Sequence, residues 1–188
     1  SLLFAARRWG NGTGIYDYQA QADSLLGWMT KEKTATMLPL IVPDRKQIVC
    51  SPAQIDTPYT DPSYHIPAFA RVWDALATNR KGGFYSQVAD TSWALLKRAQ
   101  HPVTGLYPEY STFDGAPKAT SFNAKSQTFA SDAHRVASNI GFSWAWFQDD
   151  TGALGMVEKQ LRFFTSETAG YKAEYTLEGV AQQTYVSQ

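Results

Sequence analysis

The stretch TFASDAHRVASNIGFSWAWF, residues 128–147, decides the fold prediction. From Val136 onward nearly all of its residues are apolar or small, which is typical of a helix that is buried on most of its surface. Its beginning carries a carboxylate and a guanidinium, Asp132 and Arg135, which share one face of a helix because they are three positions apart. The stretch therefore predicts a buried helix with two opposite charges at its N-terminal end.

Helical patterns occur in three pairs, each with a short turn inside the pair and a long loop before the next one. The expected pairs cover residues 2–9 with 15–32, 61–77 with 83–100, and 128–147 with 153–168. The first helix of each pair is apolar over most of its surface, whereas its partner has one polar side. Helices that are apolar all round belong inside and amphipathic helices outside, so the pattern predicts an all-α fold with two concentric layers.

Two long loops lead from an outer helix to the next inner helix, one ending at residue 60 and the other covering residues 101–130. Ordered loops of about 25–30 residues are uncommon in compact domains and usually carry function. In this arrangement both loops fall on the same rim of the helical layers. The segments LIVPD and KQIVCS predict one small β-hairpin in the first loop.

Polar and aromatic side chains gather at this rim. They are Asp61, Tyr64 and His65 at the second inner helix, Asp132 and Arg135 at the third, and Tyr107, Glu109, Tyr110, Phe113 and Asp114 in the loop between them. Aromatic rings beside carboxylates suit a neutral, hydroxylated ligand such as a sugar, whose C–H face stacks on the rings. The rim is therefore predicted to bind a sugar.

Three of these residues have both a structural and a functional interpretation. Asp132 is either a helix cap that pairs with Arg135, a role open equally to Ser131, or a general base that the adjacent guanidinium keeps ionised at the bottom of a cleft. Tyr64 is either a core tyrosine or a phenol that holds a water molecule for that base. His65 is either a core histidine or a donor to the substrate.

Composition and charge exclude several classes of protein. With 188 residues, 44% of them hydrophobic, the chain is long enough for one packed domain. Seventeen basic and seventeen acidic side chains cancel, so neither nucleic acid nor an anionic membrane surface is an expected partner. No apolar run reaches the roughly 20 residues of a membrane helix. A single cysteine, Cys50, and three scattered histidines do not suggest a disulfide or a metal site.

The beginning of the chain favours a fragment of a longer protein. Residues 1–10 lack the pattern of a secretion signal, and the chain starts within a helical pattern without an initiator Met. The compartment stays open between the cytoplasm, the periplasm and secretion from a bacterium.

Four motifs, in this order, resemble glycoside hydrolase family 8. They are DPSYHIPAF (61–69), HPVTGLYPEY (101–110), FDGAP (113–117) and SDAHRVASNIGFSWAWF (131–147). The similarity is greatest to the branch of reducing-end xylose-releasing exo-oligoxylanases. The resemblance implies an (α/α)6 barrel, of which residues 1–188 are the central part of one domain. It also implies inverting hydrolysis of β-1,4-linked xylo-oligosaccharides, which needs no metal or organic cofactor.

The resemblance implies that Asp132 is the general base, that Tyr64 helps to place the attacking water, and that Arg135 accompanies the base. Further candidates for sugar contacts are Asp61, His65, Tyr107, Tyr110, His134 and Trp146. His134 occupies a place where a bulkier aromatic is expected in the oligoxylanase branch. The general acid and a sugar-stabilising Asp of the family lie outside the chain, so its partners are expected to be the remaining parts of the same catalytic domain, without which it should not hydrolyse sugars.

Other functions stay open at this stage. The chain could be a carbohydrate-binding remnant in which Tyr64, Tyr107 and Trp146 stack on sugar and Asp132 is structural. Endo-acting xylanases, β-glucanases and chitosanases of the same family are further alternatives. A helical-repeat scaffold fits poorly, because such repeats have periods of about 34–47 residues, whereas Asp61 and Asp132 are 71 residues apart.

Overall fold

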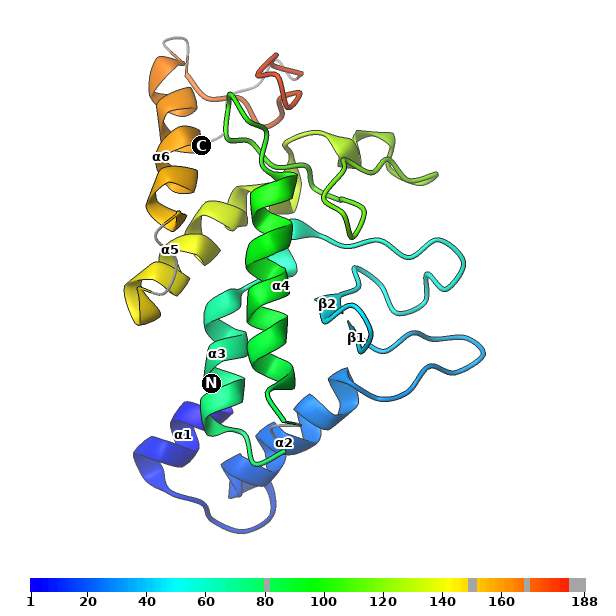
Figure 1. The fold of residues 1–188 in the computed structure, drawn as a ribbon, viewed down its shortest axis with the longest axis vertical. Coiled ribbons are helices and arrows are strands. Elements are labelled where there is room, and N and C mark those ends of the chain that lie inside the picture. The colour runs from blue at the N-terminus through cyan, green and yellow to red at the C-terminus, as the bar shows by residue number, and fades with distance from the viewer. Residues whose placement is uncertain (80–81, 149–151, 168–169, 183–188) are drawn as a thin grey trace.

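The computed structural model describes residues 1–79, 82–148, 152–167 and 170–182. Within these ranges six α-helices form three successive pairs (Figure 1). They are α1 (Leu2–Trp9) with α2 (Tyr18–Met29), α3 (Pro67–Leu76) with α4 (Phe84–Ala99), and α5 (Val136–Phe147) with α6 (Ala153–Ser166). The all-α prediction and its three pairs are confirmed. Thr168, the last residue expected in the sixth helix, lies outside the described residues.

Two predicted inner helices are interrupted near their starts by short 3₁₀ helices, η2 (Pro62–Tyr64) and η4 (Ser131–Arg135). The first interruption has a local cause, because a proline disfavours the helical conformation of the residue before it. The helix predicted from Pro62 therefore begins only at Pro67. Ile66 before it has a φ of -119° and a ψ of 87°, which is not a helical conformation. At the second, Ser131 has a φ of 44°, which separates the preceding loop from the helix.

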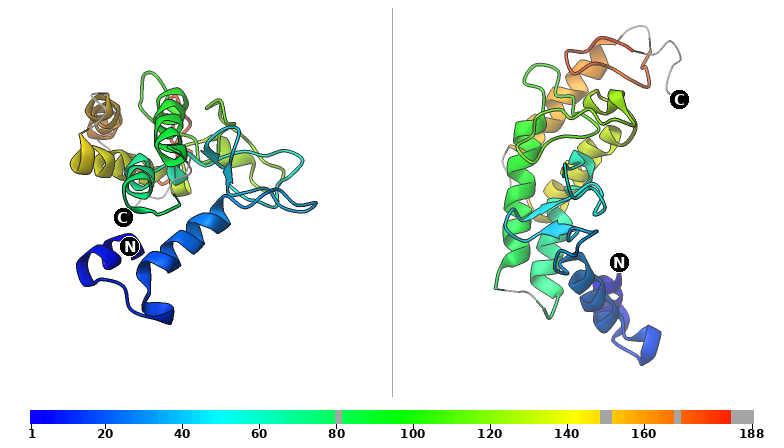
Figure 2. Two further views of the ribbon diagram at one scale, coloured as in Figure 1. Left: turned by 60° about the horizontal axis from the view of Figure 1, so that its bottom comes forward. Right: turned by 90° about the vertical axis from the view of Figure 1, so that its right-hand side faces the viewer.

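The helices form two layers, as expected. In the inner row, α3 packs against both α1 and α5, and each of the three contacts its own partner, α2, α4 or α6. Figure 2 shows α1 and α2 at one end of an elongated arrangement and α6 at the other. The ring of Trp146 joins the inner row, with its centroid 5.7 Å from that of Phe4 on α1 and 6.0 Å from that of Phe69 on α3.

The prediction that α5 is buried on most of its surface is wrong for this chain. Only four of its 12 residues are buried, because the described helices cover one side of the inner row and leave the other side open. Among the described helices α4 has the most buried residues, nine of its 16. The amphipathic helix therefore contributes more to the core than the apolar one.

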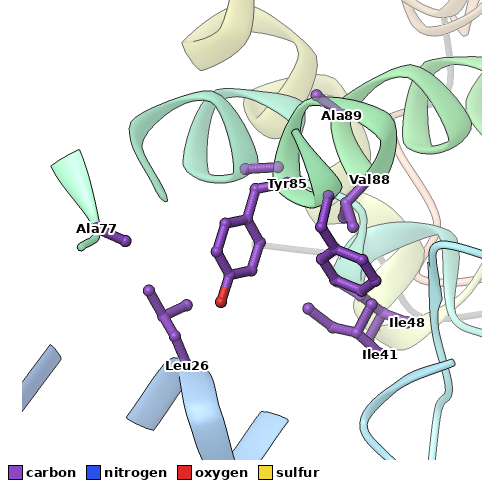
Figure 3. Packing of buried hydrophobic residues seen from close by; sticks show 9 residues of the cluster. Leu26, Ile41, Ile48, Ala77, Tyr85, Val88 and Ala89 are labelled. Carbon is purple, nitrogen blue, oxygen red and sulfur yellow. The ribbon is translucent and has the colours of Figure 1, made fainter. Parts of the chain in front are cut away.

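One core cluster lies between α2, α4 and the predicted hairpin. The hairpin is present as β1 (Ile41–Val42) paired antiparallel with β2 (Gln47–Ile48), which confirms this prediction. Figure 3 shows the Tyr85 ring among apolar side chains, with its hydroxyl directed toward Leu26. That hydroxyl has no hydrogen-bond partner among the described residues.

The long loops lie on one side of the helices, as predicted (Figure 1). Thr60 and Ser111 exchange two backbone hydrogen bonds of 2.9 Å, and Phe129 and Tyr175 exchange bonds of 2.9 and 3.0 Å. These ties join segments that are far apart in the sequence into one rim. Over the part of the chain that is described, no helix combines the length and apolarity needed to cross a bilayer.

Candidate active site

Asp132 and Arg135 form an ion pair within η4, at the start of α5. Their side chains are 43% and 52% exposed, so the pair faces solvent at the rim. An exposed ion pair on its own contributes about 0–1 kcal/mol and does not fix two long side chains. Other contacts must therefore orient it.

Ser63 of η2 supplies these contacts. Arg135 Nη2 donates to Ser63 Oγ at 3.0 Å, and Asn139 Nδ2 donates to the Ser63 carbonyl at 2.7 Å. The sequence analysis singled out neither Ser63 nor Asn139. A signal was present, because Asn139 follows Arg135 by four residues and so lies on the same helix face.

Tyr64 is brought beside this pair. The Arg135 guanidinium carbon lies 5.9 Å from the centroid of the Tyr64 ring, and the side chain is 37% exposed. Burial raises the pKa of the Tyr64 phenol, and nearby acidic groups, including Asp132, raise it further. The phenol therefore keeps its proton and can donate a hydrogen bond, with Asp132, Arg135 and Tyr64 gathered at one place.

Asp61 lies buried beside Ser63, and its predicted contact with sugar is wrong for this structure. Its Oδ1 accepts a hydrogen bond of 2.7 Å from the Ser63 N–H and so caps η2. Its Oδ2 is buried without a partner among the described residues. Burial raises the pKa of this carboxyl to about 6. Asp61 thus stabilises η2, the short helix that carries Tyr64.

His65 and Tyr107 are core residues, so their predicted sugar contacts are also wrong. The two ring nitrogens of His65 lie 2.8 Å from Thr60 Oγ1 and 3.0 Å from Ser92 Oγ. Burial lowers the pKa of His65 to about 3, so the ring is neutral. Tyr107 is fully buried in the cluster between α4, α5 and α6. Neither ring has a face that a ligand could reach, since both are completely covered.

Trp146 does not join the rim either. It lies ten residues beyond the first residue of α5, which corresponds to about 15 Å along a helix. Its ring contacts Phe4, Phe69 and Phe142. Trp146 therefore packs between three inner helices, away from the rim, and its contact with sugar stays a prediction because the residue is still 44% exposed.

Tyr110 and His134 do lie on the loop side. The half-buried ring of Tyr110 is 5.0 Å from that of Tyr59, and burial, with nearby acidic groups, raises the pKa of its phenol to about 12. His134 is exposed, and its Nε2 is 3.3 Å from the carbonyl of Ala173. Both remain candidates for contact with a ligand.

Two hollows lie near the Asp132–Arg135 pair, one lined by Arg135 and the other by Ser131 and His134. One measures about 410 Å³ and is lined by Met29, Leu40, Ile48, Ser63, Tyr64, Ile66, Trp73, Arg135 and Asn139. The other measures about 350 Å³ and is lined by Glu109, Asn123, Lys125, Ala130, Ser131, His134, Ala173 and Glu174. Both volumes fall within the range of small-ligand sites, about 300–1,000 Å³. The first hollow is mainly apolar and the second mainly polar.

The polar hollow contains two buried carboxylates. Glu109 accepts a hydrogen bond of 3.2 Å from Asn123 Nδ2, and burial raises the pKa of its carboxyl. Glu174 pairs with Lys125 at 3.0 Å. Among the described residues, no group of three His, Cys, Asp or Glu side chains is placed to hold a metal ion.

Comparison with known proteins identifies the family of the chain. The family model of glycosyl hydrolases family 8 matches residues 1–187. The chain belongs to glycosyl hydrolases family 8. A family 8 relative, the reducing-end xylose-releasing exo-oligoxylanase Rex8A of Paenibacillus barcinonensis, is 36% identical over 180 residues, which are 95% of this chain and 47% of the relative. The resemblance noted in the motifs is thereby confirmed.

Solved family 8 structures agree with the fold. A xylobiose complex of a family 8 protein from Teredinibacter turnerae superposes with a TM-score of 0.90 at 35% identity, over 96% of this chain and 48% of that one. Endoglucanase C of Ruminiclostridium cellulolyticum is more distant, at 25% identity over 147 residues, 78% of this chain and 29% of the relative. The chain spans about half the length of the exo-oligoxylanase relative and of this solved structure, and its helix pairs form part of the family's (α/α)6 barrel.

Proposed function

We propose that residues 1–188 are the central part of a single catalytic domain that hydrolyses β-1,4-linked xylo-oligosaccharides with inversion and releases xylose from the reducing end. The observation that carries this proposal is the arrangement at the rim, where Asp132 is paired with Arg135 beside the Tyr64 phenol. The similarity of the chain to an exo-oligoxylanase over 95% of the chain's length supports the choice of substrate.

The proposed mechanism uses Asp132 as the general base. In an inverting glycosidase one carboxylic acid protonates the leaving oxygen while a carboxylate activates water on the opposite face of the sugar, with about 6.5–9.5 Å between the two groups. Asp132 takes the proton from this water, Tyr64 donates a hydrogen bond that orients the water, and Arg135 holds the carboxylate in place. Another part of the catalytic domain supplies the acid.

The experiment uses the complete catalytic domain with xylotriose. Proton NMR at early times should detect the α-anomer as the first product from the β-linked substrate, because inversion occurs in one step. Asp132→Asn should lower turnover by about 10²–10⁴-fold, the usual contribution of a general base, while xylo-oligosaccharide binding persists. Turnover close to that of the unchanged protein would overturn the assignment of the base.

An endo-acting xylanase is the second candidate. It is favoured by a xylohexaose complex of a family 8 xylanase from Teredinibacter turnerae, which superposes with a TM-score of 0.90. Exo action on xylohexaose should give xylose and xylopentaose first, whereas endo action should give internal cleavage products. A carbohydrate-binding remnant would bind xylohexaose without any turnover by the complete domain.

The remaining parts of the barrel are the proposed partners of this chain. Large aromatic side chains that are exposed on α5 support this proposal, since soluble proteins rarely leave a large apolar patch uncovered. They are Phe142, Trp144, Trp146 and Phe147. The isolated 188-residue chain should associate as its concentration rises in sedimentation experiments and should not hydrolyse xylotriose. A stable monomer would contradict this proposal.

A further inference from the structure

A row of polar side chains runs along one face of η4 and α5. Arg135, Asn139 and Ser143 follow one another at intervals of four residues, and each bonds to the segment 63–68. Arg135 and Asn139 donate to the hydroxyl and the carbonyl of Ser63, and Ser143 Oγ accepts from the Ala68 N–H at 2.9 Å. This contact between two inner helices is therefore made by hydrogen bonds in a buried place.

Ser63 is held through all of its polar groups. Its N–H donates to Asp61 Oδ1, its hydroxyl accepts from Arg135, and its carbonyl accepts from Asn139. The side chain is only 3% exposed, so water does not compete for these bonds. Because a buried group that loses its partner costs free energy, this arrangement strongly prefers one geometry. The position of Ser63 relative to α5 is thereby fixed.

Ser63 is linked to both proposed functional groups, Tyr64 and Asp132. Tyr64 follows Ser63 directly in the chain, and Arg135, which donates to Ser63, is the ion-pair partner of Asp132. One residue thus connects the tyrosine to the arginine of the base. The ion pair itself is half-exposed, and without this connection it would be free to change its rotamers.

We propose that Ser63 and Asn139 are positioning residues, which hold Arg135, and through it Asp132, at a set place relative to Tyr64. The proposal rests on the function proposed above. A reacting group that is misplaced by 1 Å can lower a rate by about 10²-fold. Both residues line the apolar hollow, but the two bonds argued here run to Arg135 and between η2 and α5. Loss of one of these bonds should therefore lower kcat much more than it changes KM.

The test compares variants of the complete catalytic domain on xylotriose, each below its unfolding temperature. Ser63→Ala and Asn139→Ala should each lower kcat by about tenfold, with KM within about twofold. The expected loss is smaller than the roughly 10²-fold loss of a 1 Å misplacement because each variant removes only one of the two bonds. Ser63→Thr keeps the accepting hydroxyl and should retain at least half of kcat. Ser143→Ala is the matched control. It removes two hydrogen bonds on the same helix face, one accepted from the Ala68 N–H and one donated to the Asn139 main-chain carbonyl, and leaves the side-chain bonds of Arg135 and Asn139 to Ser63 in place. It should lower stability without lowering kcat.

Two results would overturn the positioning role. One is a kcat of Ser63→Ala within twofold of the unchanged protein; the other is an equal loss of kcat in Ser143→Ala, which would mean that any loosening of this helix contact suffices. Asp132→Asn in the same series separates the two proposals. If it keeps its turnover, the proposed function fails; if it is inactive while Ser63→Ala and Asn139→Ala are fully active, only the positioning role fails.

Discussion

Helices α4 and α5 differ in the share of polar residues on their buried faces. On α4 the buried face is largely apolar and includes Val88, Leu95 and Leu96. On α5 two of the four buried residues are polar, Asn139 and Ser143. The large aromatic side chains of α5 are exposed at the same time.

The difference teaches how an inner helix of a barrel should be interpreted. Its overall apolarity reflects the neighbours of the complete barrel, about half of which this chain matches. Its few polar residues mark the face that holds the rim residues in place, since Asn139 and Ser143 both bond to the segment that precedes or begins α3. The outer helix α4 has one such polar tie, from Ser92 to His65, and the rest of its buried side is mainly apolar.

Truncation on α4 should have the largest effect. Leu96 is fully buried in the cluster between α4, α5 and α6, so Leu96→Ala should lower the free energy of unfolding by about 2–5 kcal/mol. Urea unfolding at pH 7 measures this change. The matched control is Leu161→Ala on the exposed side of α6, which should change stability by about 0.5 kcal/mol or less. Equal losses would show that α4 is not the centre of the core.

The contribution of Asp61 to stability should depend on pH, whereas that of Leu96 should not. The pKa of Asp61 is about 6 in the folded chain, above its ordinary 3.8, so its stabilising contribution is complete below pH 4 and is lost as the pH rises through 6. Asp61→Asn removes this titration. Its free energy of unfolding relative to the unchanged chain should therefore rise by about 3 kcal/mol between pH 4 and pH 7.

Urea unfolding at several pH values tests this prediction. The cost of Leu96→Ala should stay constant over the same range, which makes it the internal control. Stability curves of Asp61→Asn and the unchanged chain that run parallel from pH 4 to pH 7 would contradict a raised pKa for this carboxyl.

A hydroxyl with a partner should matter on α5. Ser143→Ala should cost about 1–3 kcal/mol, because it leaves the buried Ala68 N–H without its acceptor. Ser138 lies on the same helix but is exposed, so Ser138→Ala should change stability by no more than about 0.5 kcal/mol. Thermal unfolding of both variants side by side decides the matter, and similar midpoints would remove the distinction.

On α4, removal of a buried hydroxyl without a partner should leave stability unchanged or raise it, in contrast to Ser143→Ala. Tyr85→Phe removes a buried hydroxyl that has no partner among the described residues, and stability should stay equal or rise by up to about 1 kcal/mol. Tyr16→Phe, at an exposed position, is the control and should have no effect. A clear loss of stability in Tyr85→Phe would mean that its hydroxyl is satisfied in solution.

Local patterns predicted most of the fold and the ion pair at the candidate site. The helix pairs and the small hairpin follow from periodicity within short windows, and Asp132 and Arg135 from their spacing. The displaced start of α3 could also have been predicted, because Pro67 restricts the residue before it. The family motif added Tyr64, which spacing alone left open between two roles.

The remaining residues could not be assigned, because their surroundings come from distant parts of the chain. His65 is covered by Thr60 and by Ser92, 27 residues away, and no local pattern shows this. Trp146 is of a residue type that often stacks on sugars, yet its ring contacts rings from two other helices. Ser63 and Asn139 were missed because serine and asparagine become informative only when their partners, 72 and 76 residues distant, are known.

The ties that join the long loops at the rim have a consequence for divergence within the family. Thr60 is bound to Ser111, and Phe129 to Tyr175, through main-chain groups alone. Exchanging the side chains that project between these anchor points leaves the anchors themselves intact. Descendants of this scaffold can therefore acquire new ligand preferences by substitution in the loops, while the framework that aligns their reactive groups is inherited unchanged.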